Sequence, residues 1–184
     1  MSHFTEVKTE IKDIEALKNA LASMNLNLEH NVTCRYYEGA PIRENVAKLP
    51  GPYDMAFEKD SNDTYSISAD FYQGHVEKVI GKDGVVLINN YSIEKLRLEA
   101  KKMGYKVYSS GENKLKVIDP NEPGKLEVIV NGDGTLSFKT SGFSGKRCTK
   151  FENLEKSFGA VVKYKRTAQY YETEEVKTKV KEYL

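Results

Sequence analysis

Residues 126–138 have the sequence LEVIVNGDGTLSF, in which two short apolar runs flank a turn sequence. Alternate residues of the two runs are apolar: Leu126, Val128, Val130, Leu136 and Phe138. A period of two places these side chains on one face of a strand, and the Asn-Gly and Asp-Gly pairs between the runs favour a tight turn. We therefore predict an antiparallel β-hairpin in this region.

The hairpin is followed by the sequence GFSGKRC at residues 142–148 and then by a helical pattern. Side chains spaced for one helix face recur every three or four residues, at Cys148, Phe151, Leu154, Glu155 and Phe158. The pattern predicts a short amphipathic helix that ends before Gly159. The first-turn amides and the dipole of a helix favour a negative charge. We predict an anion site formed by Ser144, Gly145, Lys146, Arg147 and Cys148.

The same segment has two other interpretations. A helix N-terminus beside cations stabilises a thiolate, which would make Cys148 a reactive thiol. Alternatively the glycines form an ordinary turn and Cys148 is a small core residue, which is the commoner situation. The segment lacks the full Gly-x-x-x-x-Gly-Lys-Ser/Thr pattern of a nucleotide-binding loop.

The composition is that of a globular protein. The chain has 184 residues, of which 39% are hydrophobic and 30% are charged, enough for one ordinary domain or two small ones. It has no apolar run of membrane-spanning length and no signal-peptide pattern at its start, so we expect a cytoplasmic protein that does not bind a membrane. Two distant cysteines and three scattered histidines predict neither a disulfide framework nor a metal site, and we expect no cofactor.

The net charge of +1 hides an uneven distribution. Residues 139–166 contain eight Lys and Arg against two Asp and Glu, whereas residues 1–138 carry a net negative charge. A basic segment of this kind can meet nucleic acid or an acidic partner, although many such clusters are only solvated surface.

Six further segments have the pattern of a strand: residues 4–11, 26–37, 53–59, 65–72, 105–108 and 115–118. Two helices are predicted, one that Asp13 caps and that runs to about Met24, and one that begins at Ser92. Pro and Gly residues within 38–52 indicate a surface loop. Residues 76–91 fit a helix and a strand equally well and stay unassigned.

These elements predict an α+β fold. Residues 1–118 would form a mostly antiparallel sheet with two helices on one face, for which a ferredoxin-like arrangement is one possibility. Two prolines and a glycine in 119–124 indicate a linker, after which 125–166 would form a small strand-strand-helix-strand unit and 167–184 a tail with an amphipathic helix. The small unit must pack on another part of the protein or on a partner, and an alternative is that both units share one sheet.

Several motifs in residues 1–118 are specific enough to compare with known families: Ser2-His3-Phe4, Val7-Lys8-Thr9, Ile14-Glu15-Ala16-Leu17, Tyr53-Asp54-Met55-Ala56-Phe57 and Ala69-Asp70. Together they resemble the conserved hypothetical chloroplast reading frame thirty-five family, a domain of unknown function in plastids, cyanobacteria and other bacteria. Residues 125–171 are similar to a second small domain of unknown function that is often encoded beside the first.

Genes of these two kinds commonly occur beside a gene for an ATPase of the AAA+ class. The resemblance therefore implies an accessory subunit, adaptor or substrate of such an ATPase. By motif it marks His3, Tyr53, Asp54 and Asp70 as residues that bind a ligand or partner, together with the Gly142, Gly145 and Cys148 segment. This chain departs from the family at Phe71-Tyr72, where tryptophans are frequent, and contains no Trp at all.

We consider three functions. The leading hypothesis is a non-enzymatic accessory or adaptor protein associated with an AAA+ ATPase, because no catalytic constellation is recognisable. The alternative is a module that binds a small anion or nucleotide through the 142–148 segment. A third is single-stranded nucleic-acid binding by basic and aromatic residues near the C-terminus: Lys163, Tyr164, Lys165, Arg166, Tyr170 and Tyr171.

Overall fold

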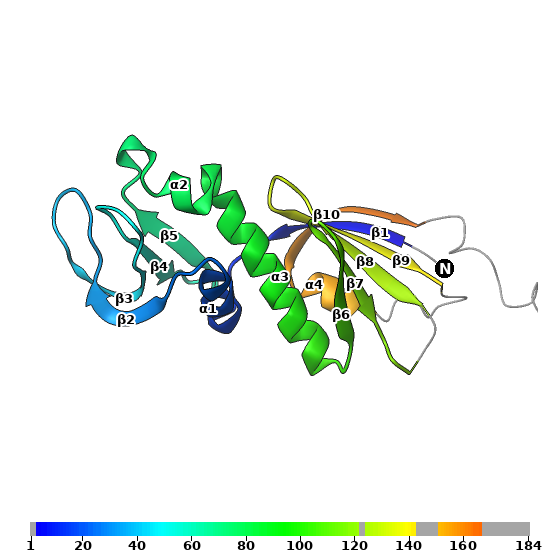
Figure 1. Ribbon diagram of the computed structural model, residues 1–184. Coiled ribbons are helices and arrows are strands. Elements are labelled where there is room, and N and C mark those ends of the chain that lie inside the picture. The colour runs from blue at the N-terminus through cyan, green and yellow to red at the C-terminus, as the bar shows by residue number, and fades with distance from the viewer. Residues whose placement is uncertain (1–2, 122–123, 143–150, 167–184) are drawn as a thin grey trace, which may run out of the picture. The chain divides into compact units, whose positions relative to one another are not determined.

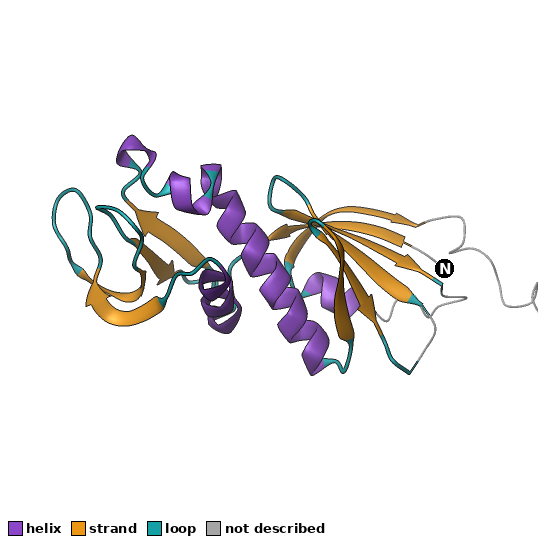
Figure 2. Ribbon diagram, viewed as in Figure 1, coloured by secondary structure: helices purple, strands orange, loops and turns teal. Residues whose placement is uncertain are grey.

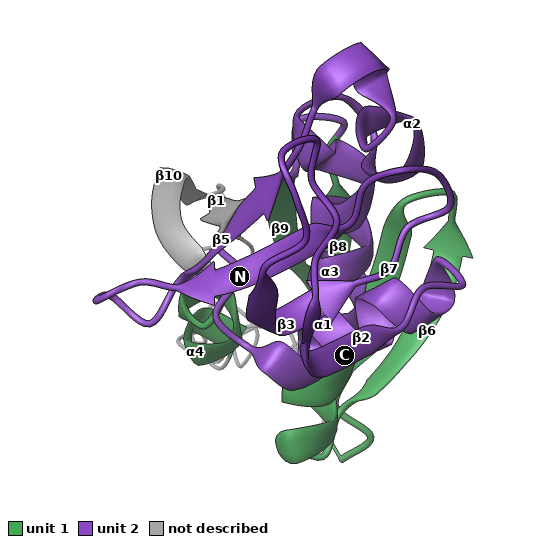
Figure 3. Ribbon diagram, turned by 90° about the vertical axis from the view of Figure 1, so that its left-hand side faces the viewer, with its two compact units in different colours: residues 1–9, 96–131, 135–184 green, residues 10–95, 132–134 purple. Residues whose placement is uncertain are grey.

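The computed structural model describes residues 3–121, 124–142 and 151–166, and for residues 3–9 and 159–166 it describes the backbone only. The chain forms two compact units (Figure 3). Unit 1 consists of residues 1–9, 96–131 and 135–184, and unit 2 of residues 10–95 and 132–134. Each unit contains one antiparallel sheet, and each is described separately below.

The sheet of unit 2 has four strands in the order β2-β3-β4-β5 (Figure 1). The strands are β2 (Leu28–Thr33), β3 (Ile42–Ala47), β4 (Met55–Lys59) and β5 (Tyr65–Ala69). Each pairs antiparallel with its neighbour in the chain, so the sheet is a simple meander. Short connections between consecutive strands favour this order.

Helix α1 (Ile14–Ser23) precedes this sheet and begins where the sequence predicts. The Asp13 side chain accepts hydrogen bonds from the N–H groups of Glu15 and Ala16, which satisfies two amides of the first turn. The hydroxyl of the buried Tyr91 accepts from the N–H groups of Lys12 and Asp13, so the start of α1 is fixed from both sides.

Strand β3 corrects the prediction of a surface loop over 38–52. Residues Asn45, Val46 and Ala47 are buried there, and Val46 packs with Cys34 and Ala56. The Pro and Gly residues that suggested a loop lie on either side of the strand, in the turns at 38–41 and 50–52. Only three consecutive residues of β3 are buried, so its sequence lacks the alternation that identifies a strand.

The segment after β5 is helical (Figure 2). It contains a 3-10 turn (Tyr72–Gly74), α2 (Glu77–Ile80), a second 3-10 turn (Lys82–Gly84) and α3 (Val85–Lys102). Ser92 was predicted to cap a helix, but it lies inside α3, where its hydroxyl donates to the Ile88 carbonyl. The unassigned residues 85–91 are therefore the first turns of the same helix.

Unit 1 contains a six-stranded sheet in the order β10-β1-β9-β8-β7-β6. Its strands are β1 (His3–Thr9), β6 (Lys106–Gly111), β7 (Lys114–Ile118), β8 (Lys125–Val130), β9 (Thr135–Ser141) and β10 (Gly159–Arg166). The N-terminal strand β1 lies between β9 and β10 and is antiparallel to both. The predicted hairpin of 126–138 forms the centre of this sheet as β8 and β9.

The predicted linker at 119–124 connects two paired strands. Ile118 of β7 is paired with Lys125 of β8, and the register continues to Lys114 and Ile129. Strands from both predicted domains therefore share one sheet, the alternative that the sequence left open. The predicted linker therefore joins two adjacent antiparallel strands, because Pro and Gly are as typical of such a connection as of a domain boundary.

Helix α4 (Glu152–Lys156) packs on one face of this sheet, where Phe151, Leu154 and Phe158 are buried. The ring centroids of Phe158 and Phe138 are 5.6 Å apart, and those of Phe151 and Tyr105 are 5.2 Å apart. The predicted helix is present from residue 152, and its predicted start at Cys148 lies outside the described residues, as does the predicted C-terminal helix.

The α+β class and the antiparallel pairing agree with the sequence-based prediction. The strands are divided between two sheets, and neither has the strand order of a ferredoxin-like fold. Within the part of the chain that the structure describes, none of the helices combines the length and apolar character needed to cross a membrane.

Candidate functional site

Asp54 is a fully buried carboxylate that precedes β4. Nε of Arg35 lies 2.9 Å from Oδ2 and Nη2 lies 2.6 Å from Oδ1. Nζ of Lys48 lies 3.1 Å from Oδ2, and the N–H groups of Arg35 and Leu49 donate to the same carboxylate at 3.0 and 3.2 Å. One buried anion thus has two cations and two backbone amides around it.

These contacts determine the pKa of Asp54. Burial by itself would raise the pKa, but the hydrogen bonds from Arg35, Lys48 and the Leu49 amide outweigh burial and lower the pKa to about 2. The carboxylate also raises the pKa of the Arg35 guanidinium through their shared hydrogen bond. Asp54 therefore stays ionised well below neutral pH.

The same residues connect two segments of backbone. Arg35 donates to the carbonyls of Leu49 and Gly51, and Lys48 donates to the carbonyl of Thr33. The Asp54 amide donates in turn to the Arg35 carbonyl. The contacts of Asp54 thus hold residues 33–35 against 48–54, which is a role in the fold. Its predicted role in binding stays a prediction.

Asp70 has a different position, at the end of β5. Its Oδ2 accepts from the Tyr37 amide at 3.0 Å and its Oδ1 accepts from the Tyr72 amide at 2.9 Å. One carboxylate therefore holds the loop after β2 beside the loop after β5. The sequence prediction marked Asp70 but gave no reason to connect it with residue 37.

Three exposed aromatic residues lie on the two loops that Asp70 connects, and we call them the aromatic surface. They are Tyr37, Phe71 and Tyr72, with 72%, 48% and 57% of their area exposed. The rings of Tyr37 and Tyr72 have centroids 5.9 Å apart and are tilted by 47°. Large apolar side chains are costly to leave in water, and contiguous ones on a surface are typical of interaction sites.

Tyr53 lies next to this surface and is mostly buried. Its ring contacts His75 edge to face, with centroids 5.8 Å apart. Burial, followed by the charges of Asp70, Tyr37 and Tyr72, raises the pKa of the Tyr53 phenol, which therefore stays protonated at neutral pH. The structure thus brings together two predicted site residues, Tyr53 and Asp70, whereas the Asp54 side chain is bound to Arg35 and Lys48.

A cavity of about 380 Å³ lies beside Phe71. It is lined by apolar and acidic residues of the same unit: Ile67, Phe71, Glu77, Ile80, Asp83 and Gly84. Phe71 thus lines this cavity and precedes Tyr72 in the chain, and a recess of this kind can accept an apolar group of a partner.

Of the remaining predicted site residues, the structure describes the backbone of some and leaves others out. His3 lies in β1, where its backbone pairs with Arg166 of β10. Lys163, Tyr164 and Lys165 also lie in β10. Ser144, Gly145, Lys146, Arg147 and Cys148 lie outside the described residues, as do Tyr170 and Tyr171.

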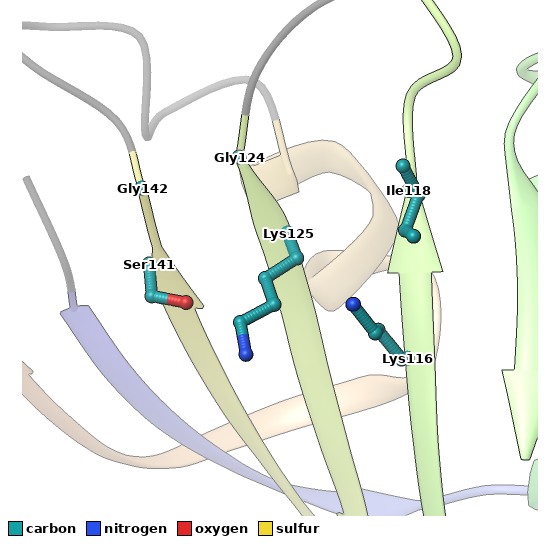
Figure 4. Close-up of a pocket in the computed structure, with 6 residues that line it drawn as sticks. All are labelled: Lys116, Ile118, Gly124, Lys125, Ser141 and Gly142. Carbon is teal, nitrogen blue, oxygen red and sulfur yellow. The ribbon is translucent and has the colours of Figure 1, made fainter. Parts of the chain in front are cut away.

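A second cavity, of about 320 Å³, lies in unit 1 next to Gly142, the last described residue of that segment (Figure 4). Lys116, Lys125 and Ser141 come from β7, β8 and β9 and lie together in this view, with the Ser141 hydroxyl turned towards Lys125. Ile118 and Gly124 complete the lining. The Ser141 Oγ is buried and has no hydrogen-bond partner among the described residues.

Thiol and metal chemistry find no support in the described residues. The thiol of Cys34 is buried in unit 2, and burial, with smaller effects from its neighbours, raises its pKa, so it is protonated at neutral pH. Among the side chains that the structure describes, no three of His, Cys, Asp or Glu are grouped as metal ligands.

A family model described as a protein of unknown function, DUF2997, matches residues 126–171, which is the region that resembled a second small domain. The match begins in β8 and extends past the end of β10. Neither a curated protein nor a solved structure matches the chain.

The sequence analysis did not find the residues that define these surfaces. Tyr37 was part of a predicted strand, and Phe71 and Tyr72 were noted only because they replace tryptophans. Lys116 and Lys125 were counted only in the total charge of residues 1–138 and were not considered as a pair. The pairing register was the missing information, because it places residues from different strands side by side.

Proposed function

We propose that this protein is a non-enzymatic accessory protein that binds another protein through the aromatic surface of Tyr37, Phe71 and Tyr72. The observation that carries the proposal is the exposure of these three side chains on the two loops that one carboxylate, Asp70, connects. Aromatic residues are enriched among the side chains that contribute most to protein interfaces.

The geometry supports a preformed site. Asp70 fixes the two loops that carry the aromatic residues, so less conformational entropy is lost when a partner binds. Tyr53, which lies near Asp70, Tyr37 and Tyr72, is itself in ring contact with His75. The cavity beside Phe71 adds a recess for an apolar side chain of the partner.

We propose an AAA+ ATPase subunit as the partner. Its support is the resemblance of residues 1–118 to a family whose genes commonly occur beside genes of such ATPases, and the absence of a recognisable catalytic constellation in the sequence. The alternative, a small anion held by the 142–148 segment, concerns residues outside the described part of the chain, and its neighbouring surface is considered below.

The test is native mass spectrometry of the tagged protein after gentle isolation from its own host. We expect an ATPase subunit to co-purify with the wild-type protein and to be lost from the variant Tyr37→Ser/Phe71→Ser/Tyr72→Ser. Loss of interface aromatic residues of this kind typically weakens binding about 30-fold or more.

A matched control replaces three other exposed apolar residues, as Met103→Ser/Tyr108→Ser/Ile129→Ser. This variant should retain the ATPase, because none of its substitutions lies on the aromatic surface. Retention of the ATPase by the aromatic variant would contradict the proposed surface, and a bound metabolite without any ATPase would contradict the accessory role.

A further inference from the structure

The exposed face of strands β6 to β9 in unit 1 carries an excess of lysines that the segment totals conceal. The opposite face is the core, with Leu115, Val117, Leu126, Val128 and Phe138 buried. Because side chains alternate along a strand, the residues between these positions lie on the other face. Five of them are lysines: Lys106, Lys114, Lys116, Lys125 and Lys139.

The pairing register arranges these lysines in rows across the sheet. One row contains Tyr108, Lys116, Glu127 and Lys139, each paired with the next. The adjacent row contains Lys106, Ile118, Lys125 and Ser141. Neighbouring strands lie about 4.8 Å apart and alternate residues of one strand about 6.7 Å apart, so the rows form a continuous surface. We call this surface the basic face.

Glu127 is the one acidic residue in the described strands β6 to β9. Its carboxylate lies 2.5 Å from Nζ of Lys125. The hydrogen bond from Lys125 lowers the pKa of Glu127 despite partial burial, and the charges of Lys125, Lys139 and Lys116 lower it further. One carboxylate thus stands against five ammonium groups, and the face has a positive potential.

The cavity of Figure 4 lies within this face. Lys116 and Lys125 offer ammonium donors, and the buried Ser141 hydroxyl has a hydrogen available for an acceptor. Gly142 adopts a positive φ of 80°, and a Cβ there would lie 3.1 Å from the Gly124 Cα, so glycine is favoured where these two backbones approach each other. A phosphate group fits these donors, because charge-assisted hydrogen bonds to its oxygens replace water.

We propose that the basic face binds single-stranded nucleic acid, with one phosphate held between Lys116, Lys125 and Ser141. The lysines extend over four strands, so a chain of phosphates can contact several of them whereas a small anion reaches only the cavity. Tyr108 is 49% exposed and is paired with Lys116, which places a ring for base stacking beside a phosphate-binding cation. An acidic protein would neutralise the lysines but would not need this ring.

The basic face is separate from the basic and aromatic residues of 163–171, which the sequence analysis named as a third candidate for binding nucleic acid. It is also independent of the aromatic surface, which belongs to unit 2. Failure of either proposal therefore leaves the other intact.

The experiment is fluorescence anisotropy of a labelled oligouridine of about 20 nucleotides, longer than the single-strand site of typical small domains. We expect the oligonucleotide to bind. The logarithm of its association constant should fall linearly with the logarithm of the salt concentration, with a slope of about −2 to −3, as for three or four neutralised phosphates on a single strand. The variant Lys116→Glu/Lys125→Glu should lose at least about tenfold in affinity.

The control variant is Lys18→Glu/Lys78→Glu, which makes the same change in net charge at exposed positions of unit 2. It should bind about as well as the wild type. A second variant, Tyr108→Ser, should bind the oligonucleotide with about fivefold lower affinity. The dependence on salt should be unchanged, because stacking does not release counterions. Circular dichroism melts establish that each variant is folded.

Three results would overturn the proposal. The first is equal loss of affinity in the two charge variants, which would indicate attraction to net charge alone. The second is displacement of the labelled oligouridine by oligoglutamate as effectively as by unlabelled oligouridine, which would indicate a site for any acidic chain. The third is a failure of the oligonucleotide to bind while inorganic phosphate raises the melting temperature of the wild type but not that of Lys116→Glu/Lys125→Glu. That result would indicate a site for a small anion only.

Discussion

Asp54 and Glu127 are both carboxylates beside lysine or arginine, yet they have opposite surroundings. Asp54 is fully buried, and two cations and two amides are directed at it. Glu127 has 41% of its side chain exposed and is outnumbered by the lysines of the basic face. Where the carboxylate is fully buried and all its donors belong to the fold, the ion pair holds the fold together. Where the cations are exposed and in excess, the remaining charge is available to a ligand.

The largest expected effect is on stability, from Asp54→Ala. The substitution leaves Arg35, Lys48 and two amides without this acceptor. Because the Arg35 and Lys48 side chains are 43% and 31% exposed and can turn to water, we expect a loss of about 2–3 kcal/mol. The matched change Glu127→Ala should cost at most about 1 kcal/mol, as for exposed pairs. Urea denaturation measures both. Equal losses would mean that burial does not distinguish the two carboxylates.

The second prediction concerns pH. The folded pKa of Asp54 of about 2 lies below the ordinary value of 3.8, so its ionised form stabilises the fold above pH 3.8 and this stabilisation is lost as the pH falls towards 2. The shift corresponds to about 2 kcal/mol.

The measurement is the difference in unfolding free energy between the wild type and Asp54→Asn from pH 6 to about pH 2. Because Asn does not titrate, the difference should shrink towards acid pH. A constant difference would show that the pKa of Asp54 is not lowered in the folded protein.

The third prediction concerns Asp70→Ala, which removes the acceptor of the Tyr37 and Tyr72 amides. Both amides lie near the surface and can turn to water, so we expect a loss of about 1–2 kcal/mol, smaller than for Asp54. The loops should also become less ordered, which amide hydrogen exchange at residues 36–38 and 71–73 would detect. Unchanged exchange at both loops would contradict the proposed bridging role.

The smallest effect is expected for Glu127→Gln. This change removes the acidic residue of the basic face, so the affinity for oligouridine should rise by about threefold while the stability changes by less than about 1 kcal/mol. The anisotropy assay at low salt measures the affinity. A decrease would mean that Glu127 positions Lys125 rather than opposing the ligand.

Local patterns predicted many of the elements. The alternation of 126–138 produced β8 and β9, and the capping residue Asp13 identified α1. Strand β3 was missed because its buried residues are consecutive, and the start of α3 because residues 76–91 have no single period. Local propensity predicts little about such segments, because the burial of their residues depends on the elements that pack against them.

The candidate sites were less predictable than the elements. Tyr53, Asp54 and Asp70 were marked by resemblance alone, and the sequence did not connect Asp54 with Arg35 or Asp70 with Tyr37. Lys116 and Lys125 belong to a part of the chain with a net negative charge, so a count along the sequence conceals them. The contacts between strands, rather than the composition of any one of them, define each surface.

The sequence by itself determined the α+β class, α1, the central hairpin and the turn residues, because these depend on interactions between residues a few positions apart. Only the tertiary structure decided which strands share a sheet, that β1 pairs with β9 and β10, and that Asp54 is neutralised within the fold. Those outcomes depend on burial and on pairing between distant segments. The free energy of such contacts depends on which residues folding brings together, and a local sequence pattern does not contain that information.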